Sequence, residues 1–212
     1  MTDATDYFVN HRRARQFPWS IYHRPLERDL ADFLAAVCAR RADAAVLVVG
    51  CGLLHEIDEA PPTLRYTVAD IDPRAVDAVL DRRDPRVVGS LVVEPESPLD
   101  RHGLTFDALY AKEVIEHMLD WPAWLAGVRR TLVPGGALWL STPNYGEPWL
   151  PALEATALEA VARRSGYTRR GMHPTRFSRA SLEAALRGAG FVDVDVKTCS
   201  ARLALTARAR NP

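Results

Sequence analysis

The sequence predicts an α/β domain built on a mostly parallel sheet. An apolar run at 46–49 ends in Gly50-Cys51-Gly52, the way a buried strand leads into a ligand-binding turn. Strand-like and helix-like segments then alternate along the chain, which is typical of parallel sheets with helical crossovers. At 212 residues the chain can bury one core, so we expect a single domain over residues 1–212.

The expected helices have apolar residues at three- and four-residue spacing or are bounded by Pro and Gly. In chain order they are 25–42, 53–60, 73–82, 123–132, an amphipathic helix with Leu150, Leu153, Leu158 and Val161 on one side, and 178–186. The expected strands are short apolar or alternating runs. In chain order they are 46–49, 66–69, the weaker 87–88 and 91–93, 106–110, 137–141 after a Pro-Gly-Gly turn, and a final pair, 191–198 and 201–209.

Two segments lie outside this alternation. Residues 1–24 mix aromatic, His and Arg residues without a period, and we expect an N-terminal arm that packs over the domain. Residues 145–176 are punctuated by Pro and Gly, and we expect a lid or substrate-side insertion there.

The composition excludes several classes of protein. The 27 basic and 27 acidic residues cancel, so no overall positive field gathers nucleic acid. Three cysteines without a CxxC pair argue against a disulfide framework or a zinc knuckle. No secretory signal and no membrane-spanning apolar run is present, and we expect a cytoplasmic protein.

The turn after the first strand has the residues of a cofactor site. Gly50 and Gly52 would let the backbone approach a ligand, and Asp70 ends the next strand, where an acid accepts hydrogen bonds from ribose hydroxyls. A dinucleotide fingerprint would place a third glycine at position 55, where this chain has His55, and this makes a nicotinamide oxidoreductase the remote alternative. On these residues alone, a plain turn with a solvated Asp70 stays open.

A family resemblance comes from segment 106–144, FDALYAKEVIEHMLDWPAWLAGVRRTLVPGGALWLSTPN. It resembles the class I S-adenosylmethionine (SAM)-dependent methyltransferases, particularly the group with the ubiquinone-biosynthesis O-methyltransferases and the small-RNA 2'-O-methyltransferases. In that group an FD strand leads to an ExxEH turn, a helix, a PGG turn and an STPN strand end. With VLVVGCG, YTVADIDP and FSRASLEAALRGAGF in register, the resemblance covers about residues 25–200.

The resemblance implies a Rossmann-like fold: a seven-stranded, mostly parallel sheet with the last strand antiparallel and helices on both faces. It also implies SAM as the cofactor. The implied cofactor-binding residues are Gly50, Cys51 and Gly52 for the methionine part, Asp70 with Ile71 for the ribose, the backbone of Lys112, and Arg28 for the carboxylate. The chain departs from the family pattern at Val48, usually an acid, at Leu54, usually a third glycine, and at Ser90, near where an acid often contacts adenine.

The ExxEH turn suggests a metal site. Glu113, Glu116 and His117 share one face if a helical turn begins there. In the metal-dependent relatives a histidine precedes the segment that corresponds to FSRASL, and His173 stands there. Together the four residues are a candidate site for Mg²⁺ or another divalent cation that holds a diol or catechol acceptor. Without a metal, His117 or His173 is the candidate general base.

The first functional hypothesis is therefore SAM-dependent methylation of a small molecule, most simply on oxygen. An RNA 2'-O-methyltransferase is the second, although the zero net charge counts against it. A degenerate SAM-binding regulatory protein is the third, suggested by Val48, Leu54 and Ser90. Tyr145 and Trp149 are candidates to line the acceptor pocket. The acceptor and the oligomeric state stay open.

Overall fold

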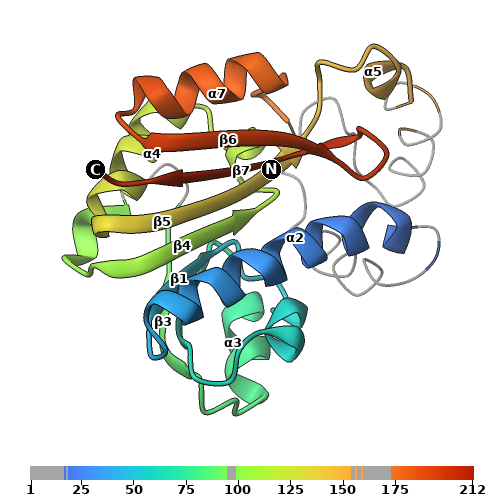
Figure 1. Ribbon diagram of the computed structural model, residues 1–212. Helices are drawn as coiled ribbons and strands as arrows, with labels where there is room; N and C mark the ends of the chain where they lie inside the picture. Colours follow the sequence, from blue (N-terminus) through green and yellow to red (C-terminus); the bar gives the residue numbers. More distant parts are fainter. Residues whose placement is uncertain (1–16, 18, 95–98, 154–155, 157–158, 160–172) are drawn as a thin grey trace.

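The computed structural model describes residues 17, 19–94, 99–153, 156, 159 and 173–212. Its centre is a seven-stranded sheet in the order β3-β2-β1-β4-β5-β7-β6 (Figure 1). All neighbouring strands are parallel except β7, which is antiparallel to both β5 and β6. The strands are β1 (Ala45–Val49), β2 (Arg65–Asp70), β3 (Val87–Val92), β4 (Phe106–Lys112), β5 (Leu132–Pro143), β6 (Val192–Cys199) and β7 (Ala204–Arg210). The expected sheet, including its antiparallel last strand, is confirmed.

Helices cover both faces of the sheet, as Figure 1 shows. One core cluster joins alternate strand residues such as Leu47 and Leu109 to the face with α4 and α7. A second joins Val46 and Val48 to α2, α3 and η1 on the opposite face. Because neighbouring residues of a strand point to opposite faces, a central strand without polar residues packs both layers. The α-helices are α2 (Trp19–Arg40), α3 (Pro73–Asp81), α4 (Trp121–Arg130), α5 (Trp149–Leu153) and α7 (Arg179–Gly188), and the 3₁₀ helices are η1 (His55–Glu59), η2 (Leu99–His102) and η3 (Ile115–His117).

The first described helix begins earlier than the sequence predicts. α2 starts at Trp19, so residues 19–24 of the expected irregular arm are helical and Pro25 lies inside the helix. An interior proline removes one helical hydrogen bond. The preceding turn is held from outside the helix, because the Ser200 hydroxyl donates to the Tyr22 carbonyl and the Tyr22 hydroxyl reaches Glu113. Tertiary contacts therefore override the boundary that Pro25 suggested.

The same helix is fastened to the sheet further along. The Asp29 carboxylate accepts hydrogen bonds from Trp139 Nε1 at 2.7 Å and from an Arg208 guanidinium nitrogen at 2.8 Å. Trp139 is fully buried in β5, and its indole N–H needs a partner there. Tyr22 and Glu27, in the N-terminal half of α2, reach Glu113 and Lys112 at the carboxyl end of β4.

Other boundaries also differ. The two weak runs at 87–88 and 91–93 form one edge strand, β3, because Gly89 and Ser90 continue its pairing with β2. The expected Pro-Gly-Gly turn lies inside β5, where the pairing with β4 shifts register between Phe106 and Ala108. The helix expected in the insertion is described only as α5. Leu158, Val161, residues 1–16 and 18, and most of 154–172 lie outside the described residues.

Two further sequence expectations concern the whole chain. Cys38, Cys51 and Cys199 are free thiols. Among the described residues, we find no helix that combines the length and the apolar character needed to span a bilayer.

Candidate functional site

The candidate site lies at the edge of the sheet where the parallel strands end. The chain runs outward from β1 through β2 to β3 and then returns to β4 on the other side of β1. In open α/β sheets, the crevice at such a reversal is where ligands bind. The ends of β1, β2, β4 and β5 bring Gly50, Asp70, Lys112 and Asn144 to this edge.

The loop after β1 has a backbone that few side chains allow. Gly50 and Gly52 have φ of 70° and 49°, in the left-handed region that glycine adopts without steric cost. A Cβ on Gly50 would lie 2.5 Å from Cγ2 of Val114, so the loop also passes close to the turn after β4. Leu54 has φ 49° as well, and this explains why the family usually has glycine at that position. We refer to residues 50–54 as the glycine loop.

Asp70 connects the second strand to the glycine loop. One carboxylate oxygen accepts the Gly52 N–H at 3.0 Å, and the other accepts the Asp72 N–H at 3.0 Å. A carboxylate has about four acceptor positions, so further acceptor capacity remains for ribose hydroxyls. Ile71 follows at the surface and is 57% exposed, where an apolar side chain can contact a flat ring. Asp70 thus ends β2 in contact with the glycine loop, and Ile71 follows it at the surface.

Lys112 ends β4 beside the loop, and its half-buried side chain lies among acids. Its ammonium lies 3.0 Å from a Glu56 carboxylate oxygen and 3.8 Å from one of Glu27. Burial favours the neutral amine, but the two carboxylates outweigh it, and the pKa of Lys112 is raised. Burial likewise opposes ionisation of Glu56, yet Lys112 lowers its pKa. Arg28 is exposed on α2, and its neighbour Glu27 is the residue that reaches Lys112.

Glu113 does not continue as a helical turn. Its φ is 58°, and the 3₁₀ turn η3 begins only at Ile115, so the expected common face of the three ExxEH residues does not form. The Glu113 carboxylate instead accepts the Tyr22 hydroxyl at 2.7 Å and the Ser141 hydroxyl at 2.9 Å. Burial raises the pKa of Glu113, and both hydroxyl donors oppose that rise. Such strained backbone is often found at functional sites.

Three of the four candidate metal ligands meet. Ligand atoms of Glu116, His117 and His173 all lie within 4.8 Å of one another. Glu116 and His173 are buried, and the His117 and His173 rings meet edge to face with centroids 5.0 Å apart. Two ligands on opposite sides of one ion lie about 4–5 Å apart at ordinary bond lengths of 2.0–2.5 Å. The spacing and the N/O donor set therefore fit a single divalent cation, and Glu113 is not a member of this group.

Hydrogen bonds of Thr175 and Tyr145 hold His173 next to the ExxEH turn. The Thr175 N–H donates to the Glu116 carbonyl at 3.2 Å, and the Thr175 hydroxyl donates to the Met118 carbonyl at 2.6 Å. The Tyr145 hydroxyl lies 2.7 Å from Nδ1 of His173. Such a contact fixes the orientation of a ligand imidazole, and Nε2 is then the nitrogen that a cation would use.

Val48 and Ser90, the other two departures from the family pattern, both lie inside strands of the sheet. Val48 is completely buried in β1, between Val68 and Tyr110 of the neighbouring strands. Ser90 lies inside β3 opposite Val68, two residues before the strand ends. The first acid beyond that end is Glu94, which is paired with Arg101 at 3.2 Å. Among the described residues near the end of β3, Glu94 is therefore the candidate acid at this position, and Ser90 is not.

Several residues of the site carry no signal in the sequence. Tyr22, Ser141 and Glu56 reach Glu113 or Lys112 across large sequence separations. A buried polar residue on a helix or strand looks like any surface residue until its partner is known. Of these, only Ser141 had a signal in the sequence, because it is the first residue of the STPN motif.

Comparisons with known proteins identify the family of the chain. The family described as "Methyltransferase domain" matches residues 21–196. The mitochondrial ubiquinone biosynthesis O-methyltransferase of Homo sapiens is 36% identical over 110 residues, covering 47% of this chain and 28% of that protein. The ubiquinone biosynthesis O-methyltransferase of Xanthomonas axonopodis pv. citri (strain 306) is 35% identical over 161 residues, covering 73% of this chain and 65% of that protein. The chain thus spans from about a quarter to two thirds of these relatives' lengths.

A solved structure shows the same fold over the whole chain. The N-methyltransferase NodS from Bradyrhizobium japonicum WM9, in complex with S-adenosyl-L-homocysteine (SAH), matches with a TM-score of 0.62 and 21% identity. The match covers 99% of this chain and 100% of that one. The chain therefore belongs to the methyltransferase domain family and has the Rossmann-like fold of the class I SAM-dependent methyltransferases.

Proposed function

We propose that the protein transfers a methyl group from SAM to a hydroxyl of a small molecule, with the help of a divalent cation. The observation that carries the proposal is the group of Glu116, His117 and His173 beside the ends of β4 and β5, where the glycine loop also lies. Relatives named as O-methyltransferases support oxygen as the acceptor atom.

SAM supplies a methyl group already activated on a sulfonium, so the protein mainly has to position the two reactants and accept or mask a proton. In the proposal, Gly50, Cys51 and Gly52 receive the methionine part with the Lys112 backbone, and Asp70 with Ile71 receives the ribose. Arg28, exposed on α2, would bind the methionine carboxylate.

A divalent cation such as Mg²⁺ would lower the pKa of a coordinated hydroxyl. In the proposal the carboxylate of Glu116 and the imidazoles of His117 and His173 hold it, and Tyr145 orients His173. The half-buried Glu113 carboxylate accepts hydrogen bonds from the Tyr22 and Ser141 hydroxyls at the same edge. We infer that Glu113 shapes the acceptor side instead of acting as a metal ligand.

Metal binding by purified protein tests the cation directly. Titration calorimetry with Mn²⁺ in the presence of SAH should show one site in the wild type, and at least about tenfold weaker binding in Glu116→Gln and His173→Gln, which each remove one ligand. His102→Gln, a histidine change on η2, is the control and should bind as the wild type does. Unchanged affinity in both ligand variants would refute the cation.

Transfer assays test the acceptor. With labelled SAM, we expect transfer to catechol-type compounds that EDTA abolishes, and no transfer to RNA oligonucleotides. Transfer that survives EDTA but is lost in His117→Gln would assign that histidine as the general base instead. Transfer to RNA 2'-hydroxyls would overturn the small-molecule assignment.

A further inference from the structure

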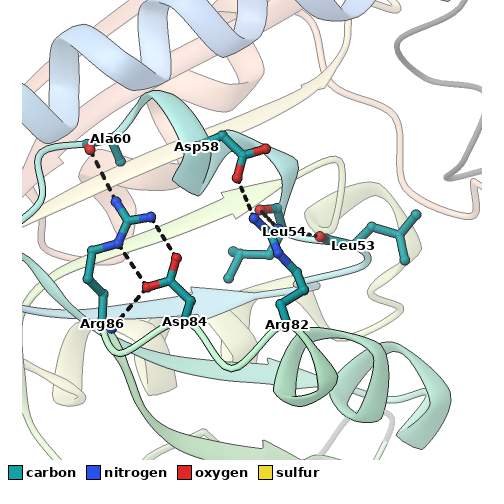
Figure 2. A network of polar contacts seen from close by, with 7 residues as sticks. All are labelled: Leu53, Leu54, Asp58, Ala60, Arg82, Asp84 and Arg86. Atoms are coloured by element: carbon teal, nitrogen blue, oxygen red, sulfur yellow. Dashed lines mark hydrogen bonds and ion pairs between the residues drawn. The ribbon is translucent and has the colours of Figure 1, made fainter.

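The geometry points to Arg82 as the residue that holds the glycine loop in the shape that binds the cofactor. Arg82 follows α3 and is remote in sequence from the loop. Nevertheless, one guanidinium nitrogen donates to the Leu54 carbonyl at 2.7 Å and to the Leu53 carbonyl at 3.1 Å (Figure 2). The inference rests on the proposed role of the loop in SAM binding.

The loop requires such support because its third left-handed residue is not a glycine. A left-handed backbone is sterically unfavourable for an L-residue, and Leu54 has φ 49°. Its side chain is only 1% exposed and packs in the cluster that contains α2 and α3. Burial of the side chain anchors Leu54, and its carbonyl accepts a long hydrogen bond from the Ile57 N–H at 3.4 Å and the shorter one from Arg82 at 2.7 Å.

The residues before and after α3 form hydrogen bonds with different parts of the glycine loop. Before the helix, the Asp70 carboxylate accepts the Gly52 N–H; after the helix, Arg82 donates to the carbonyls of Leu53 and Leu54. Asp58 of η1 is paired with the second terminal nitrogen of Arg82 and fixes the direction of the guanidinium. The Gly52 N–H before Leu53 and the carbonyls of Leu53 and Leu54 therefore have hydrogen-bond partners outside the loop, while the Leu54 N–H donates to Cys51 within it.

Arg86, also drawn in Figure 2, is a matched control for Arg82. Arg86 belongs to the same network, donates to the Ala60 carbonyl at 3.2 Å and is paired with Asp84 at 2.7 Å. It thus makes the same kinds of contact as Arg82, but with the end of η1 and not with the glycine loop. A general loss of stability should follow from either change, whereas a loss of cofactor affinity should follow only from Arg82.

The expected effect follows from the population of the binding-competent loop. Without the two carbonyl contacts the loop occupies other shapes, and the apparent dissociation constant rises by the inverse of the competent fraction. The Arg82 side chain is 30% exposed, so water replaces part of what is lost. We expect Arg82→Ala to bind SAH about fivefold more weakly, with KM for SAM raised similarly and kcat at saturating SAM unchanged.

The test is calorimetry with SAH on wild type, Arg82→Ala, Arg82→Lys and Arg86→Ala, with a thermal melt of each. Arg82→Lys should recover part of the affinity, and Arg86→Ala should bind within about twofold of wild type even where its Tm falls. If Arg82→Ala does not fold, Arg82→Lys is compared with Arg86→Lys.

Two results would overturn the inference: wild-type affinity in the Arg82 variants, or equal weakening in the Arg86 variants. Failure of the wild type to bind SAH is a different outcome. It would contradict the cofactor assignment, and this role of Arg82 with it.

Discussion

At the scale of single residues, Gly50 determines how closely the glycine loop can approach the turn after β4. Gly50 and Gly103 have similar φ values, 70° and 64°, but only the Cβ of an alanine at 50 would meet a neighbour, Val114, at 2.5 Å. The two positions therefore separate the backbone cost of an added Cβ from its steric cost.

We expect Gly103→Ala to lower the free energy of unfolding by about 1 kcal/mol, because alanine is strained in the left-handed region. Gly50→Ala should cost at least about twice as much, since Val114 must also move, and it should weaken SAH binding. Urea denaturation and calorimetry measure both effects. Equal losses of stability in the two variants would show that the close contact with Val114 does not matter.

Residue identity alone predicted the glycines and Asp70, because their roles depend on backbone freedom and on the end of a strand. It did not predict the role of Glu113. The ExxEH spacing suggested one helical face, but the backbone of Glu113 is left-handed, and its carboxylate meets Tyr22 and Ser141 instead. Helical spacing places residues on one face only where the backbone is helical, and at Glu113 it is not.

At the scale of elements, an ion pair fixes the connection between α3 and β3. The Asp84 carboxylate accepts hydrogen bonds from the Arg86 N–H at 2.9 Å and from two guanidinium nitrogens. These hydrogen bonds hold the pKa of Asp84 at about 2, below the ordinary value of 3.8. A depressed carboxyl pKa means that the folded protein binds the proton less readily than the unfolded chain does.

The stability that this pair contributes should therefore be present above about pH 4 and be lost as the pH falls towards 2. Asp84→Asn should be less stable than wild type by about 1 kcal/mol at pH 7, a value for a partly solvated pair, and the difference should vanish near pH 2. Urea denaturation of both proteins between pH 2 and 7 measures it. A constant difference over that range would rule out ionisation of Asp84 as the cause.

Element positions were predicted well where the pattern was strong and less well at boundaries. The central strands follow from apolar runs, and α7 follows from its apolar spacing and the glycines that end it. The start of α2 could not be predicted, because Pro25 is typical of the first position of a helix and the contacts of Tyr22 with Ser200 and Glu113 are remote in sequence.

At the scale of the whole molecule, the alternation of strands and helices predicted an α/β sheet, and the family resemblance predicted its seven strands and its antiparallel β7. The assembly of the candidate cation group was only partly predictable. Glu116 and His117 are neighbours in sequence, whereas His173 reaches them because Thr175 is bonded to the backbone of Glu116 and Met118. The acceptor itself cannot be read from the fold, since chains with this fold include an N-methyltransferase.

Titration calorimetry of the full chain with SAM tests the central claim most directly. The fold and the glycine loop predict one equivalent bound by the wild type. Asp70→Asn should bind about tenfold more weakly, because a charge-assisted acceptor of the ribose hydroxyls is lost. Asp77→Asn, at an exposed position of α3, should bind as the wild type does. Absence of binding by the wild type, or equal binding by Asp70→Asn, would contradict the proposed cofactor site.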